Sequence, residues 1–165
     1  MAYQELTPRR YRGLTAKRMA KMVANGSVSP VHLAEHALAQ AEAAEPKLNA
    51  YVRFLEDDAR RAAEATEAEA KAGRLRGALH GVPIAVKDNF YLRGYPVTRG
   101  SRTDAGNPAT ENAPMIERVL AAGAVIIGKT TMPEFGWKGT GISPCLLYTS
   151  PSPRDVEEPR MPSSA

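Results

Sequence analysis

Two short apolar runs separated by a helical segment constrain the fold of this chain most strongly. Residues 79–87 (LHGVPIAVK) and residues 124–129 (AVIIGK) have the length and apolar content of buried β-strands. Between them, residues 113–123 repeat apolar side chains at helical spacing. A strand, a helix and a strand in this order predict a βαβ unit, and therefore a largely parallel sheet with functional groups at the carboxyl ends of its strands.

Two amphipathic helices are predicted near the N-terminus. Thr15 and Ser29 are suitable N-caps, and Ser29 is followed by Pro30, a residue favoured in the first helical turn. We expect the first helix to end at Asn25-Gly26 and the second to run until Pro46.

The next segment predicts one short strand and one long helix. Residues 48–54 alternate and are rich in strand-favouring side chains. Residues 56–72 are Ala-rich, begin with three acidic residues and are followed by Gly73. Because this helix has no apolar side chain larger than Ala, we expect it to lie on the surface and to pack through its alanines.

The C-terminal segment differs in composition from the rest. Residues 142–165 contain five of the thirteen prolines, five serines and the single cysteine, Cys145, without helical or strand periodicity. Such composition is typical of disordered segments. We therefore expect residues 145–165 to be an unstructured tail and residues 1–144 to hold the helices and strands of a larger domain.

The net charge of +4 is not spread over the chain. Residues 1–22 carry six basic residues and one acidic residue, whereas residues 23–141 carry fourteen of each. A neutral body, and aromatic residues at only 6%, argue against nucleic-acid binding. With no apolar run of membrane-spanning length, no signal peptide and no internal disulfide, we expect no membrane partner and a cytoplasmic location.

Metal-binding patterns are also missing from the sequence. His32 and His36 lie four residues apart, but Leu-Ala-Glu stands between them, so the HExxH order is absent. We expect these two histidines and His80 to be surface or interface residues, and we predict no metal site.

Lys87 and Lys129 each end one of the apolar runs. A lysine at such a position is either a solvent-facing strand end or a buried amine with a chemical role, and for each lysine alone the first interpretation is favoured. Lys87 has the more unusual surroundings, because Pro83 precedes it and Asp88-Asn89 follows it. A desolvated lysine loses its proton more readily and can act as a base.

Two segments resemble the amidase signature family, the serine hydrolases of amide bonds. They are residues 81–88 (GVPIAVKD) and residues 121–130 (AAGAVIIGKT), and the resemblance extends over about residues 10–144. It implies an α/β fold of N-terminal helices followed by the early strands of a mixed, mostly parallel sheet. The chain would hold only part of that fold, with an unpaired sheet edge and low stability on its own.

The resemblance also implies a Ser-cisSer-Lys triad in which Lys87 is the catalytic lysine. In such sites the neutral lysine takes the proton of the nucleophilic serine through a bridging serine, and no metal or organic cofactor is needed. Lys129 would be structural. Phe135 and Trp137 would border the substrate channel, with packing in the core as the alternative. The expected partner is a small-molecule amide substrate, and the oligomeric state is open.

The sequence departs from the family's pattern where the serines are expected. The Gly-Gly-Ser-Ser-Gly-Gly run and the later Gly-Gly-Ser segment are both absent. We therefore expect a fragment of an amide-bond hydrolase that is itself inactive. Residues 135–141 (FGWKGTG) favour a general amidase over the A subunit of the Glu-tRNA(Gln)/Asp-tRNA(Asn) amidotransferase. A further alternative is a non-catalytic fragment with no independent function.

The tail itself raises a hypothesis about the gene. Residues 145–155 (CLLYTSPSPRD) look like a translated sequencing adapter, because pattern and resemblance are lost together after Pro144. Resequencing the locus tests this hypothesis, and an in-frame genomic match through Ala165 would contradict it.

Overall fold

The computed structural model describes residues 3, 7, 11–103, 107–137 and 139. Its elements, in chain order, are α2 (Ala16–Ala24), α3 (Pro30–Leu48), β1 (Tyr51–Phe54), α4 (Glu56–Lys71), β2 (Pro83–Lys87), α5 (Pro114–Ala121), β3 (Val125–Thr130) and the 3-10 helix η1 (Glu134–Gly136). The predicted tail, residues 145–165, lies outside the described residues.

The three strands form a mixed sheet in the order β1-β3-β2. β2 and β3 are parallel, with α5 in the connection between them, so the predicted βαβ unit is confirmed. β1 runs antiparallel to β3 on its other side. The fold is α/β, as expected from the resemblance, with one parallel and one antiparallel pair of strands.

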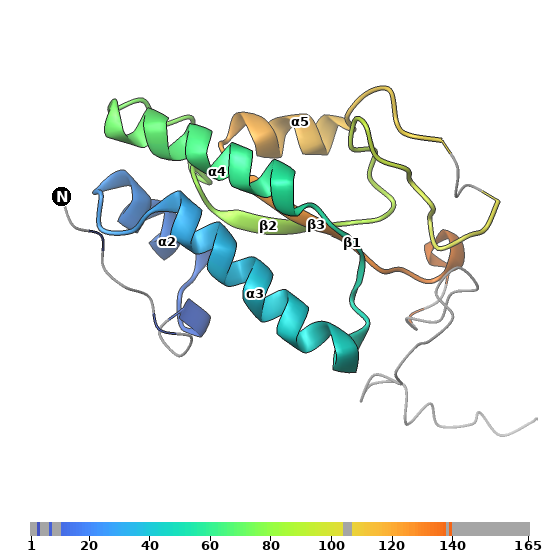
Figure 1. Ribbon diagram of the computed structural model, residues 1–165. Coiled ribbons are helices and arrows are strands. Elements are labelled where there is room, and N and C mark those ends of the chain that lie inside the picture. The colour runs from blue at the N-terminus through green and yellow to red at the C-terminus, as the bar shows by residue number, and fades with distance from the viewer. Residues whose placement is uncertain (1–2, 4–6, 8–10, 104–106, 138, 140–165) are drawn as a thin grey trace, which may run out of the picture.

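Helices cover both faces of this sheet (Figure 1). On one face, α3 and α4 pack against Val125 and Ile127 of β3. On the other face, Ile116 of α5 packs with Ile126 of β3 and Val86 of β2. The core is therefore divided by the sheet, and β3 contributes to both halves.

The two predicted N-caps are confirmed. Thr15 accepts a hydrogen bond from the backbone N–H of Arg18 at 3.2 Å. The Ser29 hydroxyl oxygen accepts from the N–H groups of Val31 and His32 at 3.0 and 3.3 Å. These bonds satisfy donors that would otherwise have no partner at each helix start.

The end of α3 differs from the prediction. The helix continues past Pro46 to Leu48 and ends at Asn49, which has a left-handed conformation with φ 47°. The strand therefore begins at Tyr51 rather than at residue 48. The carboxylate of Glu45 accepts from the N–H groups of Ala50 and Tyr51 at 3.1 and 3.2 Å, which stabilises the turn between helix and strand.

The expectation of two buried strands holds for β3 and is wrong for β2. In β3, the residues from Val125 to Lys129 are all buried, because strands flank it on both sides. β2 begins only at Pro83 and forms an edge of the described sheet, so Ala85 and Lys87 are exposed. Pro83 fits at this position, since proline is tolerated at the first residue of a strand.

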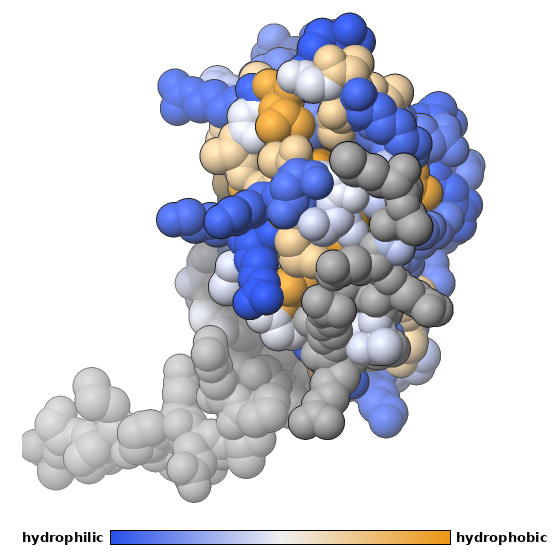
Figure 2. Space-filling view, turned by 90° about the vertical axis from the view of Figure 1, so that its left-hand side faces the viewer, coloured by the Kyte–Doolittle hydropathy of each residue, from blue (hydrophilic) through white to orange (hydrophobic). Residues whose placement is uncertain are grey.

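α4 packs through small residues, as predicted. Ala59 and Ala63 are completely buried against α3 and β3. Asp58, Glu67 and Glu69 are half-buried, and the other charged residues of the helix are exposed. In Figure 2, which looks at the molecule from the left of Figure 1, hydrophilic side chains cover much of the surface. In the part of the chain that the structure describes, no helix combines the length and apolar character needed to cross a bilayer.

Candidate functional site

The carboxyl ends of β2 and β3 meet at one edge of the sheet, because the two strands are parallel. Lys87, the last residue of β2, is paired in register with Thr130, the last residue of β3. The backbone N–H of Asp88 extends this pairing and donates to the carbonyl of Thr130 at 3.1 Å. This edge is the place where the fold predicts functional groups.

Lys87 is exposed at this edge. Among the described residues its ammonium group has neither an ion-pair nor a hydrogen-bond partner. Of the two interpretations of Lys87, a solvent-facing strand end and a buried amine, the structure shows the first. The side chain of Lys87 extends from the end of β2 without a polar partner in the described part of the chain.

Lys129 is the lysine that is buried. Its side chain is only 2% exposed, and its Nζ lies 2.7 Å from Oδ1 of Asp88, whose side chain is 1% exposed. The same Nζ donates to the backbone carbonyl of Pro96 at 2.6 Å. A buried charge is tolerated only when it is paired and hydrogen-bonded in this way. The structural role expected for Lys129 agrees with these contacts.

Asp88 is the centre of this buried group. Its Oδ2 accepts hydrogen bonds from the backbone N–H of Thr98, at 3.0 Å, and from the hydroxyl of the same residue. Its carbonyl accepts from the N–H of Arg99 at 3.4 Å. One carboxylate therefore connects the end of β2, the end of β3 and the loop of residues 96–101.

The same loop and the two residues after it, residues 98–103, pack against the segment that follows β3. Gly100 has φ +68°, and a Cβ atom there would lie 2.5 Å from the carbonyl oxygen of Met132. Ser101 is buried, and its hydroxyl donates to Oε1 of Glu134 at 2.7 Å. Only glycine permits both this conformation and this close approach.

Phe135 and Trp137 lie on this segment and are 56% and 70% exposed. Packing in the core, the alternative considered for both, does not occur. The N–H of Phe135 donates to the carbonyl of Arg99 at 2.8 Å, which holds η1 against the loop. The site therefore brings Lys87 and the aromatic segment to the same edge through Asp88 and residues 98–101.

The sequence patterns indicated no role for Asp88, Thr98, Ser101 or Glu134. In the sequence, Asp88 was noted only as the residue that follows Lys87 in the segment of residues 81–88. The other three are polar residues in loops, and their partners lie ten or more residues away in the chain. No local periodicity could have paired them.

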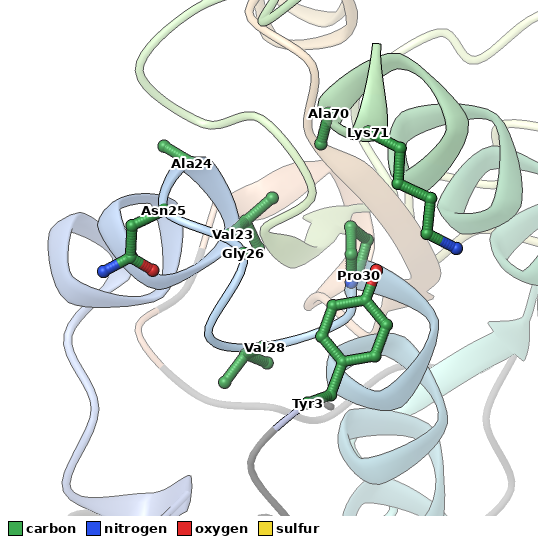
Figure 3. A pocket seen from close by; sticks show the side chains of 9 residues that line it. All are labelled: Tyr3, Val23, Ala24, Asn25, Gly26, Val28, Pro30, Ala70 and Lys71. Carbon is green, nitrogen blue, oxygen red and sulfur yellow. The ribbon is translucent and has the colours of Figure 1, made fainter. Parts of the chain in front are cut away.

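A separate cavity of about 510 Å³ lies between α2, the start of α3 and the end of α4 (Figure 3). It is lined by Tyr3, Val23, Ala24, Asn25, Gly26, Val28, Pro30, Ala70 and Lys71. The ammonium group of Lys71 at its rim is 2.5 Å from Oε2 of Glu67. None of the residues predicted for catalysis or substrate binding lines this cavity.

The three histidines do not form a metal site. His32 is exposed and His36 is half-buried, but His80 is 1% exposed, which corrects the expectation of a surface or interface residue. Its Nε2 lies 2.8 Å from the carbonyl oxygen of Thr66, and its Nδ1 accepts from the N–H of Arg76 at 3.1 Å. Within the described residues, no three His, Cys, Asp or Glu side chains gather as metal ligands would.

Comparison with known proteins places this geometry in a family. The family model described as Amidase matches residues 32–158, and this match extends into the segment predicted to be a tail. An acylamidase of Rhodococcus erythropolis is 37% identical over 134 residues, which are 81% of this chain and 28% of that protein. The A subunit of the glutamyl-tRNA(Gln) amidotransferase of Anaeromyxobacter dehalogenans is 45% identical over 113 residues, 68% of this chain and 23% of that protein.

Solved structures agree in fold. The peptide amidase of Stenotrophomonas maltophilia is 29% identical with a TM-score of 0.71, over 76% of this chain and 26% of that one. A fatty acid amide hydrolase has a TM-score of 0.82 at 20% identity, over 88% of this chain and 26% of that one, which is a likeness of fold alone. The chain spans about a quarter of the length of these relatives. From the family match and these similarities, we conclude that the chain belongs to the amidase family.

Proposed function

We propose that this chain is a segment of an amide-bond hydrolase in which Lys87 is the base of a Ser-cisSer-Lys triad. The observation that carries the proposal is the position of Lys87. Its amine is exposed and unpaired among the described residues, at the end of a strand whose next residue is fixed by a buried ion pair. A base must be held within reach of the proton that it takes, and the pairing of β2 with β3 together with the buried ion pair of Asp88 supports such a position for Lys87.

The proposed reaction begins with proton transfer. The neutral amine of Lys87 takes a proton from the bridging serine, which takes one from the nucleophilic serine. The serine oxygen then bonds to the amide carbon, backbone N–H groups hold the oxyanion, and the C–N bond breaks as the leaving amine is protonated. Water hydrolyses the acyl-enzyme to the acid and restores the serine.

Both serines of this scheme belong to glycine-rich runs that the sequence lacks. We therefore propose that the 165-residue chain by itself does not hydrolyse amides. Phe135 and Trp137 are proposed as the aromatic border of the substrate channel, for which their exposure of 56% and 70% is the support. The cytoplasmic location stays a prediction.

A chimera tests the function of the segment. Residues 1–144 replace the matching N-terminal part of the Rhodococcus erythropolis acylamidase, whose own remainder supplies the serines. We expect the chimera to hydrolyse a small amide and the isolated 165-residue chain to be inactive. Hydrolysis by the isolated chain that is lost with Lys87→Ala would contradict the proposed inactivity.

A second candidate is a segment of the A subunit of an amidotransferase. The observation in its favour is the 45% identity to the Anaeromyxobacter protein, against 37% to the acylamidase. Placing residues 1–144 in each of the two relatives separates the candidates. The first candidate predicts the higher recovery of activity in the acylamidase background, and the second predicts it in the amidotransferase background.

The third alternative, a fragment without any catalytic role, makes the opposite prediction for both chimeras. If each folds with a cooperative thermal transition and neither shows activity, this alternative is favoured over the other two.

A further inference from the structure

The cavity of Figure 3 has the size of a small-molecule site and an apolar wall. Its volume of about 510 Å³ lies within the range of about 300–1,000 Å³ that is usual for such sites. The wall consists of Val23 at the end of α2, Val28 and Pro30 at the start of α3, and Ala70 near the end of α4. Since these side chains cannot form hydrogen bonds, the part of a ligand that lies against them is apolar.

Lys71 supplies a cation at the rim of this cavity. In Figure 3, Tyr3 and Lys71 lie on one side of the cavity, and Ala24 and Asn25 lie on the other. The Nζ atom of Lys71 is 5.7 Å from the centre of the Tyr3 ring, and the side chain is 60% exposed. The hydrogen bond to Glu67 raises the pKa of Lys71, so its amine is a charged ammonium group at neutral pH.

The ammonium group of Lys71 can serve a ligand and Glu67 together. It has three N–H donors, and the carboxylate of Glu67 accepts one of them through Oε2. The other carboxylate oxygen of Glu67, Oε1, accepts from the hydroxyl of Ser29, which is the N-cap of α3. Both oxygens of Glu67 are therefore engaged, and donors of Lys71 stay available at the rim.

The charges around this end of the molecule favour an anion. Glu69, the next acidic residue of α4, is paired with Arg76 through two contacts of 2.7 Å. The exposed basic side chains of α2 form no ion pair with any other described residue, and they are Lys17, Arg18 and Lys21. Figure 2 shows apolar side chains among hydrophilic ones on this face. A ligand that combines an apolar part with a negative charge matches this surface.

We propose that this cavity binds a monocarboxylate with a short apolar chain, its carboxylate at Lys71 and its chain against Val23, Val28, Pro30 and Ala70. The inference is independent of the proposed function. The cavity shares no residue with the edge where Lys87 lies, and its test does not measure amide hydrolysis.

The test is an NMR titration of the 165-residue chain with octanoate and, separately, with octanamide. The two probes have the same chain length, but only octanoate carries a charge. We expect saturable shifts of the amide signals of Val23, Val28 and Ala70 with both probes. Octanoate should bind about two- to fivefold more tightly than octanamide, which is the usual contribution of one exposed ion pair.

Variants of Lys71 test the position of the carboxylate. Lys71→Gln should remove the preference for octanoate over octanamide, and Lys71→Arg, which keeps the charge, should retain it. Lys47→Gln, at an exposed position near the end of α3, is the matched control and should bind both probes as the wild type does. Lys71 is exposed, so these substitutions test the proposal without changing the core.

A substitution that fills the cavity tests the position of the apolar chain. Ala70→Leu places a larger side chain in the cavity, whereas Ala65→Leu makes the same change at an exposed position of α4. We expect Ala70→Leu to abolish the binding of both probes and Ala65→Leu to leave it unchanged.

Three results would each overturn the proposal. They are no saturable shift in the wild type, shifts confined to residues outside the cavity, and an unchanged preference for octanoate in folded Lys71→Gln. The last of these decides the proposal even where Ala70→Leu does not fold. Activity of the acylamidase chimera has no part in any of these results, so the two proposals can fail separately.

Discussion

The backbone N–H of Phe135 donates to the carbonyl of Arg99 at 2.8 Å, and both residues have positive φ angles, 49° and 51°. Non-glycine residues in this conformation carry a backbone cost of about 1–2 kcal/mol each. Two of them joined by one hydrogen bond show that the loop and the aromatic segment are held together by the surrounding contacts. These contacts come from Gly100, Ser101 and the buried carboxylate of Asp88.

Gly100→Ala should disrupt this contact. The new Cβ would lie 2.5 Å from the carbonyl oxygen of Met132, in addition to the strain of φ +68°. Gly94→Ala is the matched control, because Gly94 has φ +86° but no atom within 4 Å of the added Cβ. We expect Gly94→Ala to cost about 1–2 kcal/mol of unfolding free energy and Gly100→Ala clearly more. Urea unfolding followed by circular dichroism measures the difference, and equal costs would contradict the close packing.

His80→Phe should destabilise the chain because His80 hydrogen-bonds to the backbone. The N–H of Arg76 would lose its acceptor, and the carbonyl of Thr66, which lies inside α4, would lose the contact that it makes in addition to the helical hydrogen bonding. A polar group left without its hydrogen bond costs about 1–3 kcal/mol, so we expect a loss of about this size. His32→Phe, at an exposed position, should change the free energy by less than about 0.5 kcal/mol. Similar effects of the two substitutions would rule out the bridging role of His80.

We expect the folded chain to lose stability at high pH because of Tyr95. Burial, together with the carboxylate of Asp58 that accepts its hydrogen bond, raises the pKa of Tyr95 to about 12. The folded state thus favours the neutral phenol. This contribution is complete below the unfolded pKa of about 10 and is lost as the pH rises towards 12.

The measurement is urea unfolding between pH 9 and pH 12 for the wild type and Tyr95→Phe. We expect the wild type to lose more stability than the variant over this range. Tyr11 and Tyr51, whose pKa values are also raised mainly by burial, are present in both proteins and contribute to both curves. Parallel curves would show that the Tyr95–Asp58 contact does not depend on the proton.

Substitution of the exposed aromatic residues tests the proposed substrate border. Trp137→Ala and Phe135→Ala in the acylamidase chimera each remove an exposed aromatic side chain. If the two aromatic side chains contact the substrate, the KM of each variant should rise about tenfold, a value typical of one lost aromatic contact. The value of kcat should change less. Leu48→Ala, which removes an apolar side chain at an exposed position on α3, serves as the control. Unchanged KM values would remove both residues from the substrate site.

The sequence predicted the elements that depend on local signals. Thr15 and Ser29 cap their helices because a side-chain oxygen can reach an N–H two or three residues ahead, and this needs no tertiary contact. The end of α3 was missed because Asn49 adopts φ 47°, and the contacts of Glu45 rather than Pro46 determine where the chain turns.

The positions of the two lysines could not be predicted from the sequence. Lys87 and Lys129 both end apolar runs, but the strand order places one on an edge strand and the other on the central strand. Only that strand order decides which of the two lysine side chains is buried. The order depends on β1, which precedes both β2 and β3 in the chain. The buried contacts of Lys129 agree with the structural role that the resemblance implies for it. The role of Lys87 stays a prediction.

The central claim is that Lys87 is the base of an amide hydrolase, and kcat/KM of the acylamidase chimera tests it most directly. We predict that Lys87→Ala lowers kcat/KM for a small amide by about 10²–10⁴-fold or more, the usual contribution of a general base. Lys47→Ala, at an exposed position on α3, should leave kcat/KM unchanged. A folded Lys87→Ala chimera that is as active as the Lys47→Ala chimera would contradict the account.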